Sequence, residues 1–309
     1  MDDSRLPTSD LANAYAQVAG ILAGFAFVSL GNYLASGQRS SEEDSEGVLV
    51  RRISTTLFSA FAALVLISVL YALLTGEKDG TTRANTALII AGLPFGLSVL
   101  TLFFALTLMA SDRGFKEVVR LGLILVVLIG PAIVHLRLMN ALAAVDPRSN
   151  ERLSPFYVGI RLTVVLMIAA SAAWAMASWR RRRRGDHTAP IATLATSHAS
   201  LVTAVVAAVL SSVVIAKPEA YRPPRVMLYL IAVGMFLLLA VFATCAALAI
   251  HGADALRRVQ PSATRESKAK EASGATEPTH TLSPISEEIP TNRIILSLEW
   301  RSGRFKRKG

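Results

Sequence analysis

The feature that most constrains this sequence is a series of long apolar runs that contain no Asp, Glu or Lys. Each run has roughly 18 or more residues, which is enough for one α-helix to cross ~30 Å of hydrocarbon. A helix satisfies its own backbone hydrogen bonds inside hydrocarbon, whereas a lone strand cannot. Only 17% of the residues are charged, against about 25% in soluble domains. The sequence therefore predicts an all-α integral membrane bundle.

About seven segments fit a membrane span. They are residues 11–35, 53–75, 84–110, 118–145, 155–179, 190–216 and 224–250. Pro155, Pro190 and Pro224 suit the first turn of a helix, and Asp146-Pro147 ends the fourth span because a residue before proline avoids the α region. We expect a short extracytoplasmic N-terminus (1–10), a transmembrane domain (11–251) and a tail (252–309).

The distribution of Lys and Arg predicts the orientation of the bundle. Loops on one side carry eleven of these residues, and those on the other carry eight. The richer side includes the block Arg180, Arg181, Arg182, Arg183 and Arg184. Positive loops stay in the cytoplasm, so this block is the main topology anchor. The N-terminus should lie outside and the C-terminus inside a bacterial cytoplasmic membrane.

The tail differs in composition from the rest of the chain. Residues 252–290 are rich in Ser, Thr, Ala, Glu and Lys, with few large apolar side chains. Such a segment cannot bury enough surface to offset its ordering entropy, which predicts disorder. Residues 294–300 are apolar and a basic end follows. This end either lies on anionic lipid headgroups or is a loose tail.

The net charge of +10 does not indicate a nucleic-acid partner, because it resides in the loops and the tail. No predicted span contains a carboxylate or a lysine. This argues against proton or sodium coupling and against a Schiff base. No metalloprotease motif or phosphate-binding loop occurs, and the one cysteine, Cys245, cannot form a thiolate cage. We expect no catalytic site, metal or cofactor.

Polar residues gather at one depth near the predicted outer interface. His135, Arg137 and Asn140 lie in the fourth span, and Arg161 lies near the outer end of the fifth. One interpretation is a shallow pocket for an anionic group. The alternative is a set of snorkelling arginines paired with loop carboxylates and water.

His198 lies in the predicted cytoplasmic half of the sixth span, among Thr and Ser residues. As a functional residue it would be a metal ligand, a haem ligand or a proton relay. The alternative is a histidine hydrogen-bonded across helices, in a helix whose small polar residues mediate packing. His135 lies in the opposite half of the membrane and does not supply a second haem ligand.

Small residues recur at every fourth position in two spans. The stripe in the first span includes Ala16, Gly20 and Gly24, and the third has Gly92 and Gly96. This spacing lets helix backbones approach closely. The stripes pack helices within one bundle or form a self-association face, and the oligomeric state stays open.

The stretch Tyr15-Ala-Gln-Val-Ala-Gly-Ile-Leu-Ala-Gly-Phe-Ala-Phe-Val-Ser-Leu30 resembles the first helix of uncharacterised multi-pass membrane proteins from actinobacteria. An Ala- and Arg-rich composition with little Lys suits such a source. The resemblance implies a multi-pass architecture, and no activity carries over from it.

Three hypotheses for the function follow. The first is a non-enzymatic membrane protein that acts through its basic cytoplasmic face, with lipid or a protein as its partner. The second is an ion-uncoupled transporter or facilitator of a small solute, in which Pro94 and Pro131 break helices around a cavity. The third is an intramembrane enzyme that uses His135 or His198.

Overall fold

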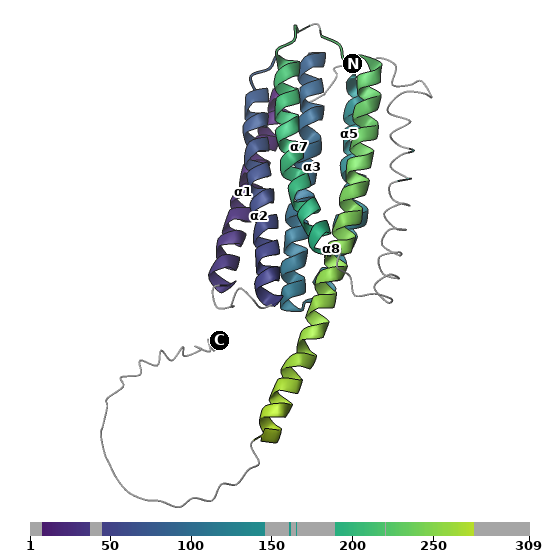
Figure 1. The fold of residues 1–309 in the computed structure, drawn as a ribbon. Coiled ribbons are helices and arrows are strands. Elements are labelled where there is room, and N and C mark those ends of the chain that lie inside the picture. The colour runs from purple at the N-terminus through teal and green to yellow at the C-terminus, as the bar shows by residue number, and fades with distance from the viewer. Residues whose placement is uncertain are drawn as a thin grey trace, which may run out of the picture. The chain divides into compact units, whose positions relative to one another are not determined.

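The structure is a computed structural model, and it describes residues 8–37, 45–145, 161, 165, 189–219 and 221–274. Its elements are all helices: α1 (Thr8–Gly37), α2 (Ser45–Leu74), α3 (Thr82–Arg113), α4 (Lys116–Leu123), the π-helix η1 (Ile124–Ile129), α5 (Gly130–Val145), α7 (Ala189–Ile215) and α8 (Arg225–Gly274). The prediction of an all-α fold is confirmed (Figure 1).

Six helical segments of the described chain are long and apolar enough to cross a membrane. They are Thr8–Ala35, Leu49–Leu74, Thr82–Arg113, Lys116–Leu142, Ile191–Ile215 and Val226–Ile250. The predicted fifth span, 155–179, lies outside the described residues apart from Arg161 and Val165, so the count of seven stays a prediction. The six helices indicate a multi-pass membrane protein in contact with lipid.

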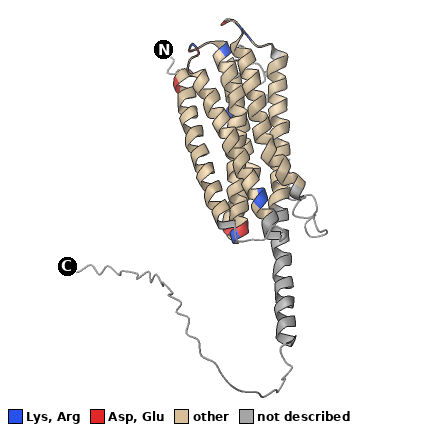
Figure 2. Ribbon diagram, turned by 60° about the vertical axis from the view of Figure 1, so that its left-hand side comes forward, with Lys and Arg blue, Asp and Glu red and all other residues tan. Residues whose placement is uncertain are grey.

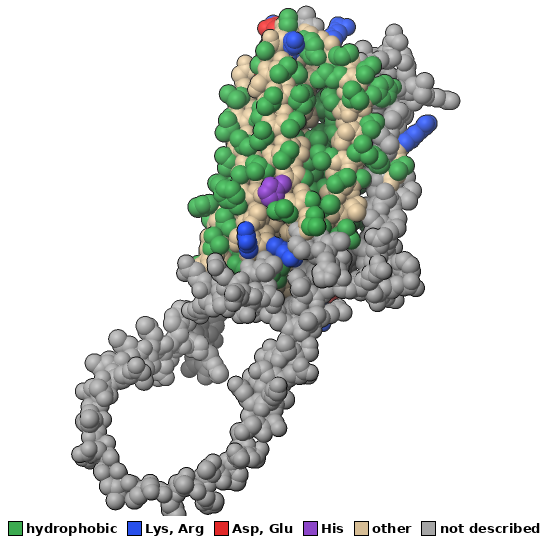
Figure 3. Space-filling model, in the orientation of Figure 1, with side chains coloured by type: hydrophobic (Ala, Val, Ile, Leu, Met, Phe, Trp, Pro, Cys, Tyr) green, Lys and Arg blue, Asp and Glu red, His purple; other side chains and the backbone are tan. Residues whose placement is uncertain are grey.

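The surface of the bundle agrees with this conclusion. Charged residues lie mainly at the two ends of the bundle (Figure 2), and the face shown in Figure 3 is mostly hydrophobic between these ends. Large apolar side chains such as Ile21, Leu73 and Ile191 are exposed on the outside. In a membrane, these side chains would contact acyl chains rather than water.

The C-terminal helix is longer than expected. The seventh span was predicted to end at Ile250 and disorder to begin at Gly252, but α8 continues to Gly274. Residues 251–274 contain several Ala, Arg, Glu and Lys residues, which have high helix propensity. Disorder is therefore not confirmed for 252–274, and residues 275–309 lie outside the described part.

The chain divides into two units, Met1–Ala263 and Thr264–Gly309. The first unit contains the bundle, and the described part of the second is the end of α8.

Polar contacts gather the start of α1, the α2–α3 loop and the α7–α8 loop at one end, here called the N-terminal end of the bundle. The backbone N–H and the hydroxyl of Ser9 donate to the Asp79 carboxylate at 2.8 and 3.0 Å. Arg83 pairs with Glu77 and donates to the Lys217 carbonyl at 2.8 Å. These contacts bring together segments that are far apart in the sequence.

The contact between α1 and α2 is built on small residues. The buried residues of α1 include Ala12, Ala19, Ala23, Ala26 and Tyr33, and successive members of this set are seven, four, three and seven residues apart. This heptad-like spacing keeps one seam facing its partner. A stripe with a strict step of four drifts around the helix by about 40° per step, because each residue turns it by about 100°.

Helix α3 is the central element, and α2, α5 and α7 all pack against it. Pro94 lies within α3, yet the helix is continuous from Thr82 to Arg113. The expectation that Pro94 breaks its helix is therefore wrong.

Candidate functional site

A cavity of about 630 Å³ lies among α1, α2, α3, η1 and α5 and is here called the main cavity. Its polar lining comprises Tyr15, Tyr71, Arg137 and Asn140. The rest of the wall is apolar and includes Val99, Leu100, Phe103, Leu125 and Ile133. Concave sites of roughly 300–1,000 Å³ with a few placed polar groups are typical of small-molecule binding.

Close helix packing forms the floor of this cavity. A Cβ added at Gly96 would lie 2.5 Å from a methyl group of Val134, and one added at Gly92 would lie 2.9 Å from Leu138. Only glycine therefore lets α3 and α5 approach this closely. These contacts also set the register, because Gly92 lies at the level of Leu138 and Gly96 at that of Val134.

A π-helix continues this wall. In η1 the N–H of Gly130 donates to the carbonyl of Leu125, five residues earlier, and Pro131 follows with no N–H to donate. A π turn widens the helix, and such turns are frequent at functional sites. Pro131 was expected to break the helix, but α4, η1 and α5 run without interruption from Lys116 to Val145.

An aromatic cluster closes the wall opposite α5. Tyr15 stacks on Tyr71 with ring centroids 5.2 Å apart, and Phe95 lies 5.3 Å from Tyr15 and 6.0 Å from Tyr71. Tyr71 is only 1% exposed. No described residue forms a hydrogen bond with the Tyr71 hydroxyl. No local sequence pattern indicated this cluster, because its three members come from three separate spans.

The structure does not bring all four residues of the predicted polar cluster together. Arg137 and Asn140 are exposed and line the main cavity. His135 is fully buried on another side of α5, with its ring 6.2 Å from that of Phe236 in α8. Arg161 is exposed and does not line this cavity. His135 and Arg137 share a depth but are separated by about 160° around the helix, whereas Arg137 and Asn140 are about 60° apart.

The other predicted residues have varied environments. Ala16 accepts a hydrogen bond from the Ser68 hydroxyl at 2.9 Å, and a Cβ at Gly20 would lie 3.5 Å from the same oxygen. Gly24 is exposed, and no described atom lies within 4 Å of a Cβ built there. The packing residues of α1 are thus shifted toward Ala19 and Ala23. The block Arg180–Arg184 lies outside the described residues.

His198 is exposed on α7, and its Nδ1 lies 2.9 Å from the Leu194 carbonyl of the same helix. The polar contact of α7 with α2 is made instead by the hydroxyl groups of Thr56 and Ser197, which are 2.8 Å apart. Within the described ranges, no group of three or more His, Cys, Asp or Glu side chains could hold a metal ion.

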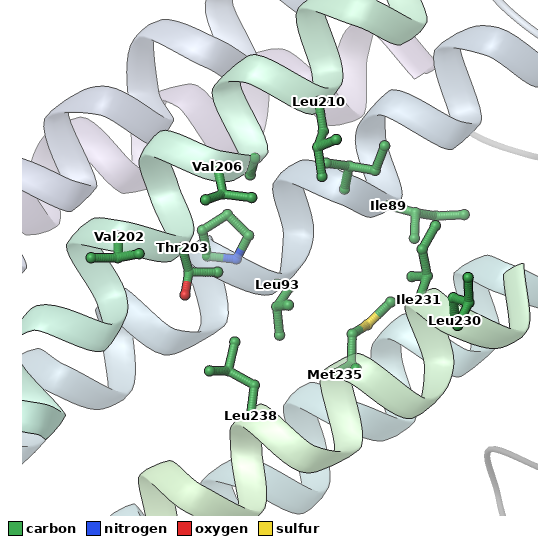
Figure 4. Close-up of a pocket in the computed structure, with 14 residues that line it drawn as sticks. Ile89, Leu93, Val202, Thr203, Val206, Leu210, Leu230, Ile231, Met235 and Leu238 are labelled. Carbon is green, nitrogen blue, oxygen red and sulfur yellow. The ribbon is translucent and has the colours of Figure 1, made fainter. Parts of the chain in front are cut away.

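A second cavity, of about 270 Å³, lies among α3, α7 and α8 (Figure 4). Its wall includes Leu93, Pro94, Val206 and Met235, and among the described lining residues Thr203 alone has a polar side chain. The Thr203 hydroxyl donates to the Ala199 carbonyl of its own helix. This space, here called the small cavity, is therefore apolar.

In comparisons with protein families, with curated proteins and with solved structures, no match to this chain was found.

Proposed function

We propose that this chain is a non-enzymatic membrane protein that binds a small apolar or amphipathic solute in the main cavity and facilitates its movement without ion coupling. The observation that carries the proposal is one cavity that combines long apolar walls with the polar groups of Arg137, Asn140 and two tyrosines. Such a lining holds an apolar body and orients it through a few polar contacts.

The residues that line the two cavities support transport without ion coupling. Neither cavity has Asp, Glu or Lys among its described lining residues. Ion- and proton-coupled carriers place such groups along the transport path, since a charge in hydrocarbon is costly unless it has a function. A facilitator that follows an existing gradient needs none.

We further propose seven crossings, with the N-terminal end of the bundle outside a bacterial cytoplasmic membrane. Val145 lies near the N-terminal end because α5 is antiparallel to α3, whereas α7 begins at the opposite end and reaches the N-terminal end at Lys217. A further crossing within residues 146–188 would connect these two ends, which supports the count of seven. The excess of Lys and Arg in the loops opposite the N-terminal end supports the orientation.

Flux measurements in reconstituted vesicles test the transport proposal. The purified protein should accelerate equilibration of apolar or amphipathic solutes, and Val99→Trp should abolish the acceleration by filling the main cavity. Val206→Trp is the matched control, because Val206 lines the small cavity. No flux across a broad solute panel would count against transport, and equal losses in both variants would count against the main cavity as its site.

A second candidate function is interaction through the cytoplasmic tail. It is favoured by the continuity of α8 for 24 residues past the end of its candidate span at Ile250, through a segment that contains Arg257, Arg258, Lys268 and Lys270. A pull-down should recover partners with the full-length protein and lose them after truncation at Ile250. Recovery of the same partners by both proteins would reject this function.

A further inference from the structure

We propose that the ligand of the main cavity is a single-chain anionic amphiphile, with a carboxylate or phosphate headgroup at Arg137 and an alkyl chain along α3. This inference rests on the proposed function and specifies its ligand. This amphiphile enters the cavity from the bilayer.

The polar groups of the cavity lie at one level. A Cβ at Gly92 would lie 2.9 Å from Leu138 and 3.9 Å from the Tyr71 hydroxyl. Leu138 is adjacent to Arg137 and lies within one turn of Asn140. Arg137 and Asn140 are therefore attached to one turn of α5, and the Tyr71 hydroxyl from α2 lies near the level of that turn. Together they supply only hydrogen-bond donors and amide or hydroxyl oxygens, which suits an anionic oxygen ligand.

The positive charge of Arg137 indicates that the headgroup is an anion. Arg137 lies in the candidate span Lys116–Leu142, five residues from its end, and no described residue forms an ion pair or hydrogen bond with it. A charge in hydrocarbon is usually paired or reaches the interface. No carboxylate occurs among the described residues that line the cavity. A bound anion would provide a counter-charge that the described residues do not, and guanidinium binds carboxylate or phosphate through two parallel hydrogen bonds.

The length of the main cavity and its opening toward the membrane indicate that the apolar part of the ligand is a single alkyl chain. From Gly92 to Phe103 the cavity follows α3 for about 17 Å, past Val99 and Leu100. Phe103 and Ile133 on its rim are 40% and 53% exposed on the apolar face of the bundle. The main cavity thus has polar side chains at one level and an apolar wall along α3, which accommodates one headgroup and one alkyl chain. Such a ligand can enter laterally from the membrane.

Spin-label spectroscopy in phosphatidylcholine nanodiscs tests this inference with the full-length protein. The probes are a spin-labelled fatty acid and its methyl ester at pH 9, well above the ordinary pKa of a carboxyl group. We expect the protein to immobilise the acid more than the ester, by at least about threefold in relative association constant, as one ion pair would give.

Four variants assign the effect to individual groups. Arg137→Gln should reduce binding of the acid to the level of the ester, and Arg137→Lys should retain most of the preference. Tyr71→Phe should weaken binding of the acid by a smaller factor. Arg161→Gln is the matched control, because Arg161 is an exposed arginine outside the cavity, and it should change nothing. Circular dichroism and gel filtration verify that each variant is folded.

The outcomes separate this inference from the function on which it rests. If Val99→Trp releases both probes while Arg137→Gln has no effect, the cavity binds amphiphiles and the anionic class is wrong. Equal losses in Arg137→Gln and Arg161→Gln would show general membrane electrostatics and would also overturn the inference. If Val99→Trp releases neither probe, the proposed function fails together with its ligand.

Discussion

The main and the small cavity lie on two sides of the same helix, α3, and Ile89 belongs to the walls of both. The main cavity has a volume of about 630 Å³ and contains an arginine, an asparagine and two tyrosines. The small cavity has a volume of about 270 Å³, and its described lining includes one hydroxyl, that of Thr203, which already bonds the backbone of its own helix. Volume alone does not make a ligand site. The two spaces differ mainly in polar groups that the described fold leaves without partners.

The strongest test of this comparison removes the close approach of α3 and α5. Gly96→Ala should destabilise the protein by about 2–3 kcal/mol, because the added methyl group would collide with the Val134 side chain. Thermal unfolding in detergent micelles measures the effect. Gly24→Ala is the control and should change stability by less than about 0.5 kcal/mol, since its Cβ would meet no described atom. Equal effects would show that this contact does not support the cavity floor.

A second substitution loosens α3 on the side of the small cavity. Arg83→Met removes the pairing with Glu77 and the hydrogen bond to the Lys217 carbonyl at the end of α7. We expect a loss of about 2 kcal/mol in unfolding free energy, since a largely buried carboxylate would lose its partner. Arg120→Met, at an exposed arginine, should be close to neutral. Solute binding in the main cavity should persist, and its loss would indicate that the two sides of α3 are coupled.

A third substitution fills the small cavity. Val206→Phe should leave ligand binding and flux unchanged and raise stability by about 0.5–1 kcal/mol, as cavity-filling changes commonly do. Isothermal titration in nanodiscs and thermal unfolding measure the two quantities. A loss of flux in this variant would move the site from the main cavity to the small one.

The smallest expected effect concerns the hydroxyl of the small cavity. Thr203→Val should change stability by less than about 0.5 kcal/mol, because this hydroxyl bonds only its own helix backbone. By contrast, Tyr71→Phe should alter ligand affinity without lowering stability, because no described residue bonds the Tyr71 hydroxyl. Measuring both variants under the same conditions compares the Thr203 hydroxyl, which is hydrogen-bonded within its own helix, with the Tyr71 hydroxyl, which no described residue bonds.

Sequence reasoning recovered the helices because length and polarity decide them. The apolar runs predicted six segments that the structure contains, with boundaries displaced by a few residues, such as Thr82 against the predicted residue 84. The end of α8 was misjudged because composition outside the membrane does not distinguish a polar helix from a disordered segment. The predicted fifth span and the arginine block remain predictions.

The site was predicted only in part, because hydropathy gives the depth of a residue and not its direction around the helix. His135 was grouped with Arg137 by depth, yet it faces α8 while Arg137 faces the main cavity. The strict step of four selected Gly24 instead of the buried Ala23. Tyr15 and Tyr71 were missed because their stacking depends on which helices are neighbours, and no local pattern encodes that.

The π-helix η1 gives the chain tolerance to changes in length at one place. Its turns, from Ile124 to Ile129, hold more residues than a regular α-helix needs over the same stretch. Deleting one residue there would let the segment relax to α-helical geometry. The side chains of α4 and of the part of α5 that carries Arg137 would then keep their directions around the helix axis. A deletion elsewhere in a span would rotate every following side chain by about 100°. We therefore expect variants one residue shorter within η1 to retain the cavity, and equally short variants within α3 to lose it.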